Sequence, residues 1–223
     1  MEEELVGHRE FLFKILMVGE VSTGKTSLIK RYVHNIFNMH YKMTVGVDFA
    51  LKVIKWDDNT MIRLQLWDIA GQERFSNMSR IYYKEAVGAL VVFDVTRQNT
   101  LDGAIKWKSD IDSKITLSDT DQPIPVILLA NKIDLFNANC EDDDNTWVKI
   151  RDNMDKLCET HRFKTWVETS AKNNIGIESA ITKLVELVLA NVKDQSNDTD
   201  HRDINLVDLD SDEESLTPKP DCC

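Results

Sequence analysis

Short apolar runs alternate along the chain with segments whose apolar residues recur at helical spacing. The runs are predicted strands, and they cover residues 11–19, 47–56, 61–70, 88–95, 125–131 and 165–171. The segments with helical spacing lie at 25–37 and near 101–117, 145–161 and 176–192. This alternation predicts an α/β fold, in which helices cover both faces of a mostly parallel sheet.

The second and third runs are separated by the polar sequence DDNT at residues 57–60, which predicts an antiparallel hairpin. The six-stranded sheet should therefore be parallel except for one antiparallel strand. The runs 88–95 and 125–131 are apolar almost throughout, as expected of central strands that are covered on both faces. Ligands of such sheets bind at the carboxyl ends of the strands.

Composition and length indicate one globular domain with unstructured ends. The chain has 223 residues, of which 42% are hydrophobic and 29% charged. We expect a flexible N-terminus at 1–9, a domain at 10–192 and a disordered acidic tail at 193–223. No secretory signal is expected at the start, and no apolar run is long enough to span a membrane. The four cysteines suit a reducing cytosolic setting better than a disulfide framework.

The net charge of −11 lies mainly in the tail. Between Asp194 and Asp221, ten acidic residues against two basic ones give −8, so the remainder of the chain carries −3. No basic stripe remains for binding nucleic acid, so we expect no nucleic-acid partner. The consecutive carboxylates of the loop 139–145 lack the alternating spacing of a calcium site and indicate a solvated loop.

The sequence GEVSTGKT at residues 19–26 matches the phosphate-binding pattern G-x-x-x-x-G-K-[ST] between a predicted strand and a predicted helix. Backbone N–H groups of such a loop and of the helix N-terminus bind phosphates. Lys25 should reach the outer phosphates, and the Thr26 hydroxyl should ligate Mg²⁺. The nucleotide-binding residues predicted here are Gly19, Val21, Ser22, Thr23, Gly24, Lys25, Thr26 and Ser27. The alternative is a glycine turn without a ligand.

The sequence WDIAGQE at 67–73 follows the third predicted strand. Asp68 at the strand end can hold the Mg²⁺ shell, and Gly71 allows a backbone N–H to approach the terminal phosphate. Gln72 is then placed to orient an attacking water, although it could also be a solvated surface glutamine. We predict that Gln72, Lys25 and Gly71 take part in catalysis.

The sequences NKID at 131–134 and ETSAK at 168–172 follow the last two predicted strands. The Asp134 carboxylate can accept hydrogen bonds from the ring N–H and the exocyclic amine of guanine, whereas adenine lacks that ring N–H. This pattern favours GTP over ATP. Asn131 should tie loops together, the Lys132 stem should cover the base, and the N–H of Ala171 can meet the guanine oxygen. Each tetrapeptide alone also suits an ordinary loop.

With these four motifs in this order, the chain resembles the small GTPases of the Ras superfamily, and over residues 10–192 it resembles the Rab family. The Rab-like segments are VGVDF (45–49), RLQLWD (63–68), RFSNMS (74–79), YYKEA (82–86) and VVFDVT (91–96). The segments around Ile69 resemble most the Rab branch that serves lysosome-related organelles. The resemblance implies the P-loop NTPase fold and bound Mg²⁺ with GTP or GDP.

The resemblance also implies roles for single residues. Thr44 would be the switch threonine that closes on Mg²⁺ when the γ-phosphate is present, and Asp68 would act on that ion through water. Phe37 would pack edge-on against guanine. Ser170 would support Asp134. Within the same loop as Ser170, Ala171 and Lys172 complete the predicted nucleotide-binding set.

Three aromatic residues, Phe49, Trp67 and Tyr82, match the triad through which Rab surfaces meet effectors, with ordinary core packing as the alternative. The terminal Cys222 and Cys223 resemble a double geranylgeranylation signal. Two lipid chains would give the stable anchoring that one chain does not. Unmodified exposed thiols are the alternative.

The resemblance implies a GTP/GDP switch that recruits effectors in vesicle and organelle trafficking. Its partners would be an exchange factor, an activating protein, effectors, a prenylation escort and a GDP-dissociation inhibitor. It would lie on the cytoplasmic face of intracellular membranes and cycle with the cytosol. Because no arginine finger in cis is evident, hydrolysis should be slow without an activating protein.

Three other hypotheses remain open from the sequence. The first is an ATP-dependent P-loop kinase or ATPase, against which NKID and ETSAK argue. The second is a membrane scaffold that holds GTP and hydrolyses it poorly, which the branched side chain of Val21 beside the γ-phosphate position supports. The third is a lipid-anchored structural protein without nucleotide, against which Lys25 and Asp134 argue.

Overall fold

The computed structural model describes residues 9–40, 42–75, 79–117, 122–136 and 146–196. The predictions for the N-terminal residues 1–8, the loop 139–145 and the acidic tail from residue 197 onward, with Cys222 and Cys223, lie outside the described residues.

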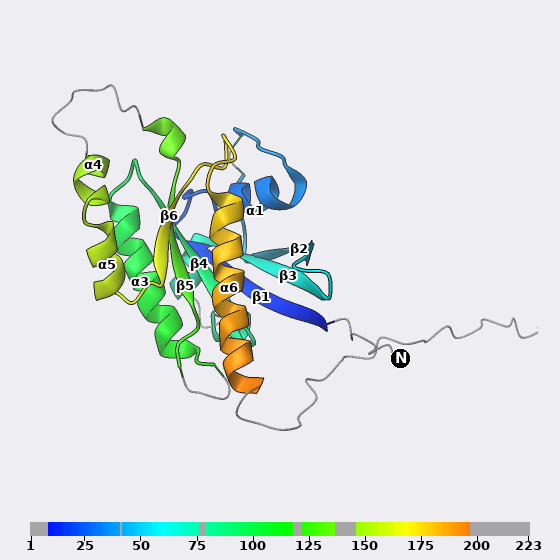
Figure 1. Ribbon diagram of the computed structural model, residues 1–223. Helices are drawn as coiled ribbons and strands as arrows, with labels where there is room; N and C mark the ends of the chain where they lie inside the picture. The colour runs from blue at the N-terminus through cyan, green and yellow to red at the C-terminus, as the bar shows by residue number, and fades with distance from the viewer. Residues whose placement is uncertain (1–8, 41, 76–78, 118–121, 137–145, 197–223) are drawn as a thin grey trace, which may run out of the picture.

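One six-stranded sheet forms the centre of the molecule, in the order β2-β3-β1-β4-β5-β6 (Figure 1). Its strands are β1 (Arg9–Gly19), β2 (Val47–Lys55), β3 (Thr60–Ile69), β4 (Gly88–Asp94), β5 (Val126–Asn131) and β6 (Thr165–Thr169). β2 pairs with β3 in the antiparallel sense, and all the other pairs are parallel. The predicted sheet, with its single antiparallel strand, is confirmed.

Helices cover both faces of this sheet, as Figure 1 shows. Helices α1 (Lys25–His34) and α6 (Ile177–Ser196) pack on one face, and α3 (Asn99–Lys114), α4 (Thr146–Arg151) and α5 (Met154–Thr160) pack on the other. The shorter elements are η1 (Gly71–Phe75), α2 (Ser79–Tyr83) and η2 (Ile133–Leu135).

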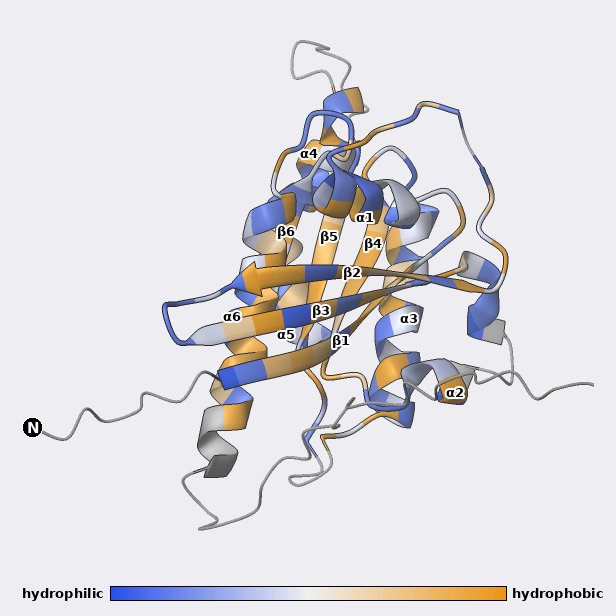
Figure 2. Cartoon of the chain, turned by 90° about the vertical axis from the view of Figure 1, so that its right-hand side faces the viewer, coloured by the Kyte–Doolittle hydropathy of each residue, from blue (hydrophilic) through white to orange (hydrophobic). Residues whose placement is uncertain are grey.

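Each face of the sheet has its own hydrophobic core, because successive side chains of a strand point to opposite faces. Leu16 and Val18 of β1 belong to the core beneath α3, whereas Ile15 and Met17 belong to the core beneath α1 and α6. β4 is buried along its whole length, and Figure 2 shows the hydrophobic colour running through β4 and β5. The continuous apolar runs are thus the central strands, as predicted.

Two predicted helices differ in extent from the observed ones. The helix expected at 145–161 is two helices, α4 and α5, separated by a turn in which the Asn153 side chain donates to the carbonyl oxygen of Lys149 at 3.1 Å. Asparagine favours such turns because its side chain competes for backbone groups. Helix α1 ends at His34 rather than at residue 37, because Asn35 takes a left-handed conformation with φ 56°. This early end leaves Phe37 in the following loop.

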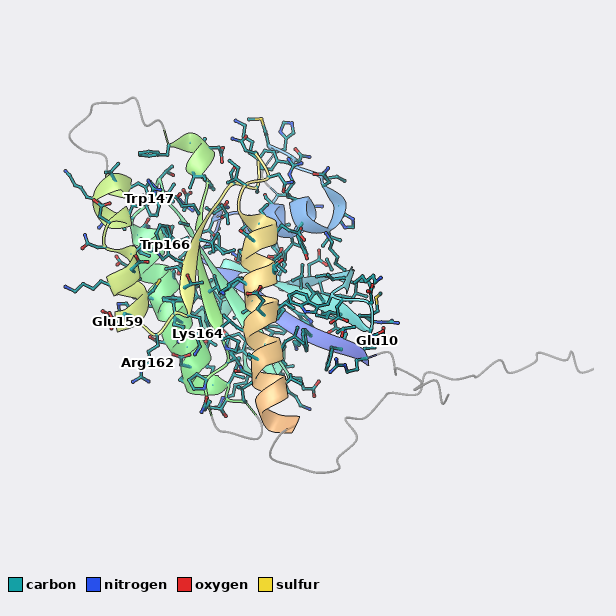
Figure 3. All side chains as sticks on the ribbon, viewed as in Figure 1. Glu10, Trp147, Glu159, Arg162, Lys164 and Trp166 are labelled. Atoms are coloured by element: carbon teal, nitrogen blue, oxygen red, sulfur yellow. The ribbon has the colours of Figure 1, made fainter. Side chains whose placement is uncertain are left out.

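The short helix α4 is held against the sheet by aromatic contacts. Figure 3 shows Trp147 of α4 beside Trp166 of β6, and their rings meet edge to face with centroids 6.1 Å apart. Trp147 also packs against Phe93 of β4, at 5.8 Å between centroids. These contacts hold α4 against β4 and β6.

Candidate functional site: a nucleotide cavity at the carboxyl ends of the strands

The carboxyl ends of β1, β3, β4, β5 and β6 meet at one edge of the sheet, where register places Asp94 beside Asn131 and Asn131 beside Thr169. A cavity of about 440 Å³ opens there. The predicted site residues that line it are Val21, Ser22, Gly24, Lys25, Thr26, Ser27, Phe37, Thr44, Gly71, Gln72, Asn131, Lys132, Asp134, Ala171 and Lys172. The structure thus brings all four motifs to one cavity, as the sequence predicted.

Four of the predicted site residues are buried and do not line the cavity: Gly19, Thr23, Asp68 and Ser170. The wall also contains residues that sequence reasoning missed: Lys30, Ile36, Asn38, Met39, His40, Lys42, Met43 and Leu135. They belong to α1, to η2 and to the irregular segment after α1, which carries no motif of its own.

The phosphate loop leads into the N-terminus of α1, and both line the cavity. Gly24 stands at the start of α1 with φ 102°, and no side chain caps this helix end. Its first turn contains no acidic residue, so the positive end of the helix dipole is left for an anion. A side chain at Gly19 is excluded, because its Cβ would lie 2.2 Å from the carbonyl oxygen of Val92.

Lys25 crosses under this loop. Its Nζ donates to the carbonyl oxygens of Gly19 and Glu20, both at 3.0 Å. Burial lowers the pKa of Lys25 to about 8, against the opposing charges of Asp68 and Glu20. An anionic phosphate in the cavity would favour the charged ammonium, so the lysine is suited to bind one.

Three oxygen-bearing side chains converge beside Lys25. The Thr26 and Thr44 hydroxyls lie 2.8 Å apart, Thr26 donates to Oδ2 of Asp68, and Thr44 lies 3.4 Å from the same oxygen. Asp68 is buried, its Oδ1 lacks a hydrogen-bond partner among the described residues, and burial raises its pKa. Two hydroxyls and an unsatisfied buried carboxylate oxygen are hard oxygen donors of the kind that Mg²⁺ prefers. The cluster therefore suits the predicted magnesium site.

Gly71 lies directly against the phosphate loop. A Cβ at this position would lie 2.5 Å from the backbone nitrogen of Val21 and 2.9 Å from Val21 Cγ2. Only a residue without a side chain permits this approach. Gln72 follows at the start of η1, is exposed and lines the cavity. The branched Val21 side chain thus lies beside Gly71, which was predicted to approach the terminal phosphate.

The opposite end of the cavity carries the predicted guanine-binding groups. Ser170 Oγ donates to Oδ1 of Asp134 at 2.6 Å and accepts the N–H of Asn173 at 3.0 Å. Asn131 is buried, and its side-chain amide donates to the carbonyl oxygen of Thr23 in the phosphate loop at 2.8 Å. These contacts agree with the predicted supporting role of Ser170 and the loop-tying role of Asn131.

Asp94, at the end of β4, connects the two ends of the cavity and was missed by sequence reasoning. Lys132 Nζ lies 2.8 Å from its Oδ2, and Arg97 Nε donates to the same oxygen at 3.0 Å. Burial alone would raise the pKa of Asp94, but hydrogen bonds from Lys132 and Thr96 hold it below its usual value. The ammonium of Lys132 is therefore fixed, which orients its stem along the cavity wall.

Two further arginines join segments that are distant in sequence. Arg31 of α1 donates to the carbonyl oxygens of Ala171 at 2.8 Å and Lys172 at 3.0 Å, and its guanidinium lies 5.9 Å from the Phe37 ring. Arg74 of η1 pairs with Glu20 of the phosphate loop at 2.9 Å. Nothing in the local sequence distinguishes these arginines from surface residues.

The outer face of the β2–β3 hairpin exposes aromatic surface. Phe49 is 61% exposed and stacks on Trp67, with ring centroids 6.2 Å apart. Lys14 Nζ lies 3.7 Å from the centroid of the Trp67 ring and donates to the carbonyl oxygen of Lys84 at 2.8 Å. Tyr82 is half-buried and packs against the core beneath α3. Two of the three predicted effector residues thus stack on each other.

Among the helices in the part of the chain that the structure describes, none has the length and apolar character needed to cross a membrane.

The sheet order and the arrangement of the four motifs define a P-loop GTPase of the Ras-family fold. The family model for the Ras family matches residues 14–190. The chain is 52% identical to Ras-related protein Rab-32A of Dictyostelium discoideum over 217 residues, which are 97% of this chain and 95% of that protein. It is 51% identical over 215 residues to Ras-related protein Rab-32 of Mus musculus, covering 96% of this chain and 92% of that protein.

Ras-related protein Rab-7L1 of Rattus norvegicus is 46% identical over 203 residues, which cover 90% of this chain and 95% of that protein. The chain therefore belongs to the Ras family, and within it to the Rab GTPases, in the branch of Rab-32 and Rab-7L1. The Rab resemblance found in the sequence is confirmed. The protein is a small GTPase of membrane trafficking that hydrolyses GTP, which excludes the ATP-dependent and nucleotide-free hypotheses.

Proposed function

We propose that this protein is a lipid-anchored GTP/GDP switch that recruits effectors at intracellular membranes, in trafficking to lysosome-related organelles. The observation that supports this proposal is a single cavity that has phosphate-binding groups at one end and guanine-binding groups at the other. Lys25 and Thr26 lie at the phosphate end, and Asp134, held by Ser170, lies at the base end.

Binding of the nucleotide uses both ends of the cavity. In this proposal the carboxylate of Asp134 accepts from the guanine ring N–H and amine, and the Ala171 N–H donates to the guanine oxygen. The Phe37 ring packs on the base. Lys25 and the N–H groups of the phosphate loop and of the α1 N-terminus bind the phosphates.

Thr26, Thr44 and Asp68 hold Mg²⁺, Asp68 through water. When it is bound, the ion would neutralise negative charge on the phosphates. Thr44 belongs to the loop after α1, whereas Thr26 belongs to α1 itself, so their 2.8 Å contact closes that loop over the site. Loss of the γ-phosphate releases Thr44 and Gly71, which is the switching step.

Hydrolysis is the attack of water on the γ-phosphate, with transfer of that phosphoryl group to water. Gln72 orients the water, while the N–H of Gly71 and the ammonium of Lys25 stabilise charge on the phosphate oxygens. The Val21 side chain lies against Gly71, the residue before Gln72, and lines the same cavity. We therefore expect slow intrinsic hydrolysis that an activating protein accelerates.

Membrane attachment is assigned to Cys222 and Cys223, each carrying a geranylgeranyl group. Two chains provide the membrane affinity that one chain lacks, and the acidic tail has no polybasic patch to help. Such a molecule needs a prenylation escort and a GDP-dissociation inhibitor to cycle between the cytoplasmic membrane face and the cytosol. Phe49, Trp67 and Tyr82 form the effector surface, and their exposure is greatest at Phe49.

The binding proposal is tested by competition against a bound fluorescent GDP. Unlabelled GDP and GTP should displace it, whereas ATP and ADP should not, and Mg²⁺ chelation should accelerate its release. Equal displacement by adenine nucleotides would contradict the role of Asp134. The Asp134→Asn variant should bind xanthosine diphosphate better than GDP, because its amide then matches the additional ring carbonyl of xanthine.

A GTP-bound scaffold with very poor hydrolysis is the second candidate, and the contact between Val21 and Gly71 favours it. Single-turnover GTP hydrolysis by the wild type, Val21→Gly and Gln72→Leu, with and without a Rab-activating protein, distinguishes the two. If the protein is a switch, the wild type should hydrolyse GTP slowly alone, Val21→Gly should hydrolyse it faster, and the activating protein should strongly accelerate hydrolysis by the wild type. If the protein is a scaffold, the activating protein should not accelerate its GTP hydrolysis. Fast and equal intrinsic rates for the wild type and Val21→Gly would contradict any restraint by Val21.

A further inference from the structure

Arg97, in the turn between β4 and α3, contacts the phosphate loop from outside the cavity. Its Nη2 donates to the carbonyl oxygen of Val21 at 3.0 Å, although 76 residues separate the two in sequence. Its Nε donates at 3.0 Å to Asp94, whose side chain is only 2% exposed. One guanidinium thus joins a buried carboxylate to a single peptide group of the loop.

That peptide group joins Val21 to Ser22. Every described peptide bond is trans, so the C=O and N–H of this peptide point in opposite directions. With the carbonyl directed at Arg97, the N–H of Ser22 is directed to the other side of the loop, where Ser22 lines the cavity. The contact therefore fixes the direction of one N–H donor toward the phosphates.

The backbone of Ser22 makes such support necessary. Ser22 has φ 63°, a left-handed conformation that glycine adopts freely and a residue with Cβ adopts at a cost. The peptide before Ser22 could relax by rotating, which would turn its N–H away from the cavity. The hydrogen bond from Arg97 opposes this rotation.

We propose that Arg97 is a positioning residue of the nucleotide site, which holds the Val21–Ser22 peptide so that the N–H of Ser22 faces the phosphates. Asp94 holds Arg97 and also pairs with Lys132 of the guanine motif at 2.8 Å. The buried carboxylate of Asp94 is therefore connected to the phosphate loop through Arg97 and to the base-binding loop through Lys132. This inference rests on the proposed nucleotide site and adds a residue that does not line it.

The test measures dissociation of fluorescent GDP and single-turnover GTP hydrolysis in the full-length chain. Arg97→Ala should release GDP about tenfold faster, as expected from losing one hydrogen bond from a charged donor. Arg97→Lys keeps the charge beside Asp94 but has one nitrogen in place of the two that reach Asp94 and the Val21 carbonyl oxygen, so it should retain thermal stability and still release GDP faster. The matched control is Arg63→Ala, which removes an exposed arginine paired with Glu10 on the sheet and should behave as the wild type.

Ser22→Gly provides a rescue that a merely structural role of Arg97 would not show. Glycine removes the cost of the left-handed conformation, so Ser22→Gly should restore most of the GDP retention lost in Arg97→Ala. The amide resonance of Ser22 should shift in Arg97→Lys with GDP bound. Wild-type release rates in both Arg97 variants, or no rescue by Ser22→Gly, would overturn the inference. Failure of the wild type to bind guanine nucleotide would instead overturn the proposed function.

Discussion

Replacing Gly71 by alanine tests the contact between the start of η1 and the phosphate loop. The added Cβ would lie 2.5 Å from the Val21 nitrogen and 2.8 Å from the Glu20 carbonyl carbon. Both atoms belong to the backbone, so no side-chain rotation relieves the overlap. No left-handed conformation is required at Gly71, which confines the perturbation to this steric overlap.

The size of the effect follows from the distance that must be gained. Ordinary contact begins at 3.4 Å, so the two segments must separate by about 0.9 Å. Overpacking of this kind costs about 1–3 kcal/mol. The cost falls on the arrangement in which Gly71 is proposed to face the γ-phosphate, and it corresponds to about 5- to 150-fold in the preference for GTP over GDP.

The assay compares the affinities of the wild type and Gly71→Ala for GDP and for a non-hydrolysable GTP analogue. Affinity for GDP should change little, whereas affinity for the analogue should fall, and hydrolysis should fall with it. A second variant, Val21→Ala with Gly71→Ala, removes the contact with Val21 Cγ2 at 2.9 Å but leaves both backbone contacts. It should show no rescue. An unchanged ratio of affinities, or full rescue by Val21→Ala, would refute the steric reasoning.

Three further predictions concern Ser170 at the guanine end of the cavity, the buried carboxylate of Asp94 and the buried thiol of Cys158. Ser170→Ala removes the 2.6 Å hydrogen bond to Asp134 and should accelerate GDP release about tenfold or more, measured with fluorescent GDP, while Ser179→Ala on the α6 surface serves as a control. Because the pKa of Asp94 is lowered in the folded protein, its contribution to stability is present above about pH 4 and is lost as the pH falls below that value. Urea unfolding should therefore show the wild type more stable than Asp94→Asn at neutral pH and the difference shrinking in acid; a constant difference would contradict this cause. Burial raises the pKa of Cys158 to about 11, so a thiol reagent at pH 8 should modify it only after unfolding, as peptide mapping would show.

Much of the fold follows from local patterns in the sequence. β4 and β5 are buried on both faces, and their continuous apolar runs predicted this directly. The turn DDNT between β2 and β3 predicted the antiparallel pair. The four motifs could be placed at one cavity because parallel strands end at the same edge of a sheet.

The rest depends on contacts between distant segments. Arg97 and Arg31 are ordinary arginines in sequence, and only the folded chain places them against Val21 and Ala171. The break between α4 and α5 depends on Asn153 turning its side chain back to the backbone, which competes with a helical pattern that continues on both sides. Sequence periodicity detects such competition poorly.

The stacking of Trp67 has a practical consequence for following this protein in solution. Its indole lies between the ammonium of Lys14 and the ring of Phe49, and the next residue is Asp68 of the proposed magnesium site. Indole fluorescence depends on nearby charge and on exposure to water. Trp67, one of five tryptophans in the chain, therefore lies at the junction of the proposed metal site and the proposed effector face, so the part of the fluorescence that Trp67→Phe removes should report nucleotide exchange and effector docking without a label.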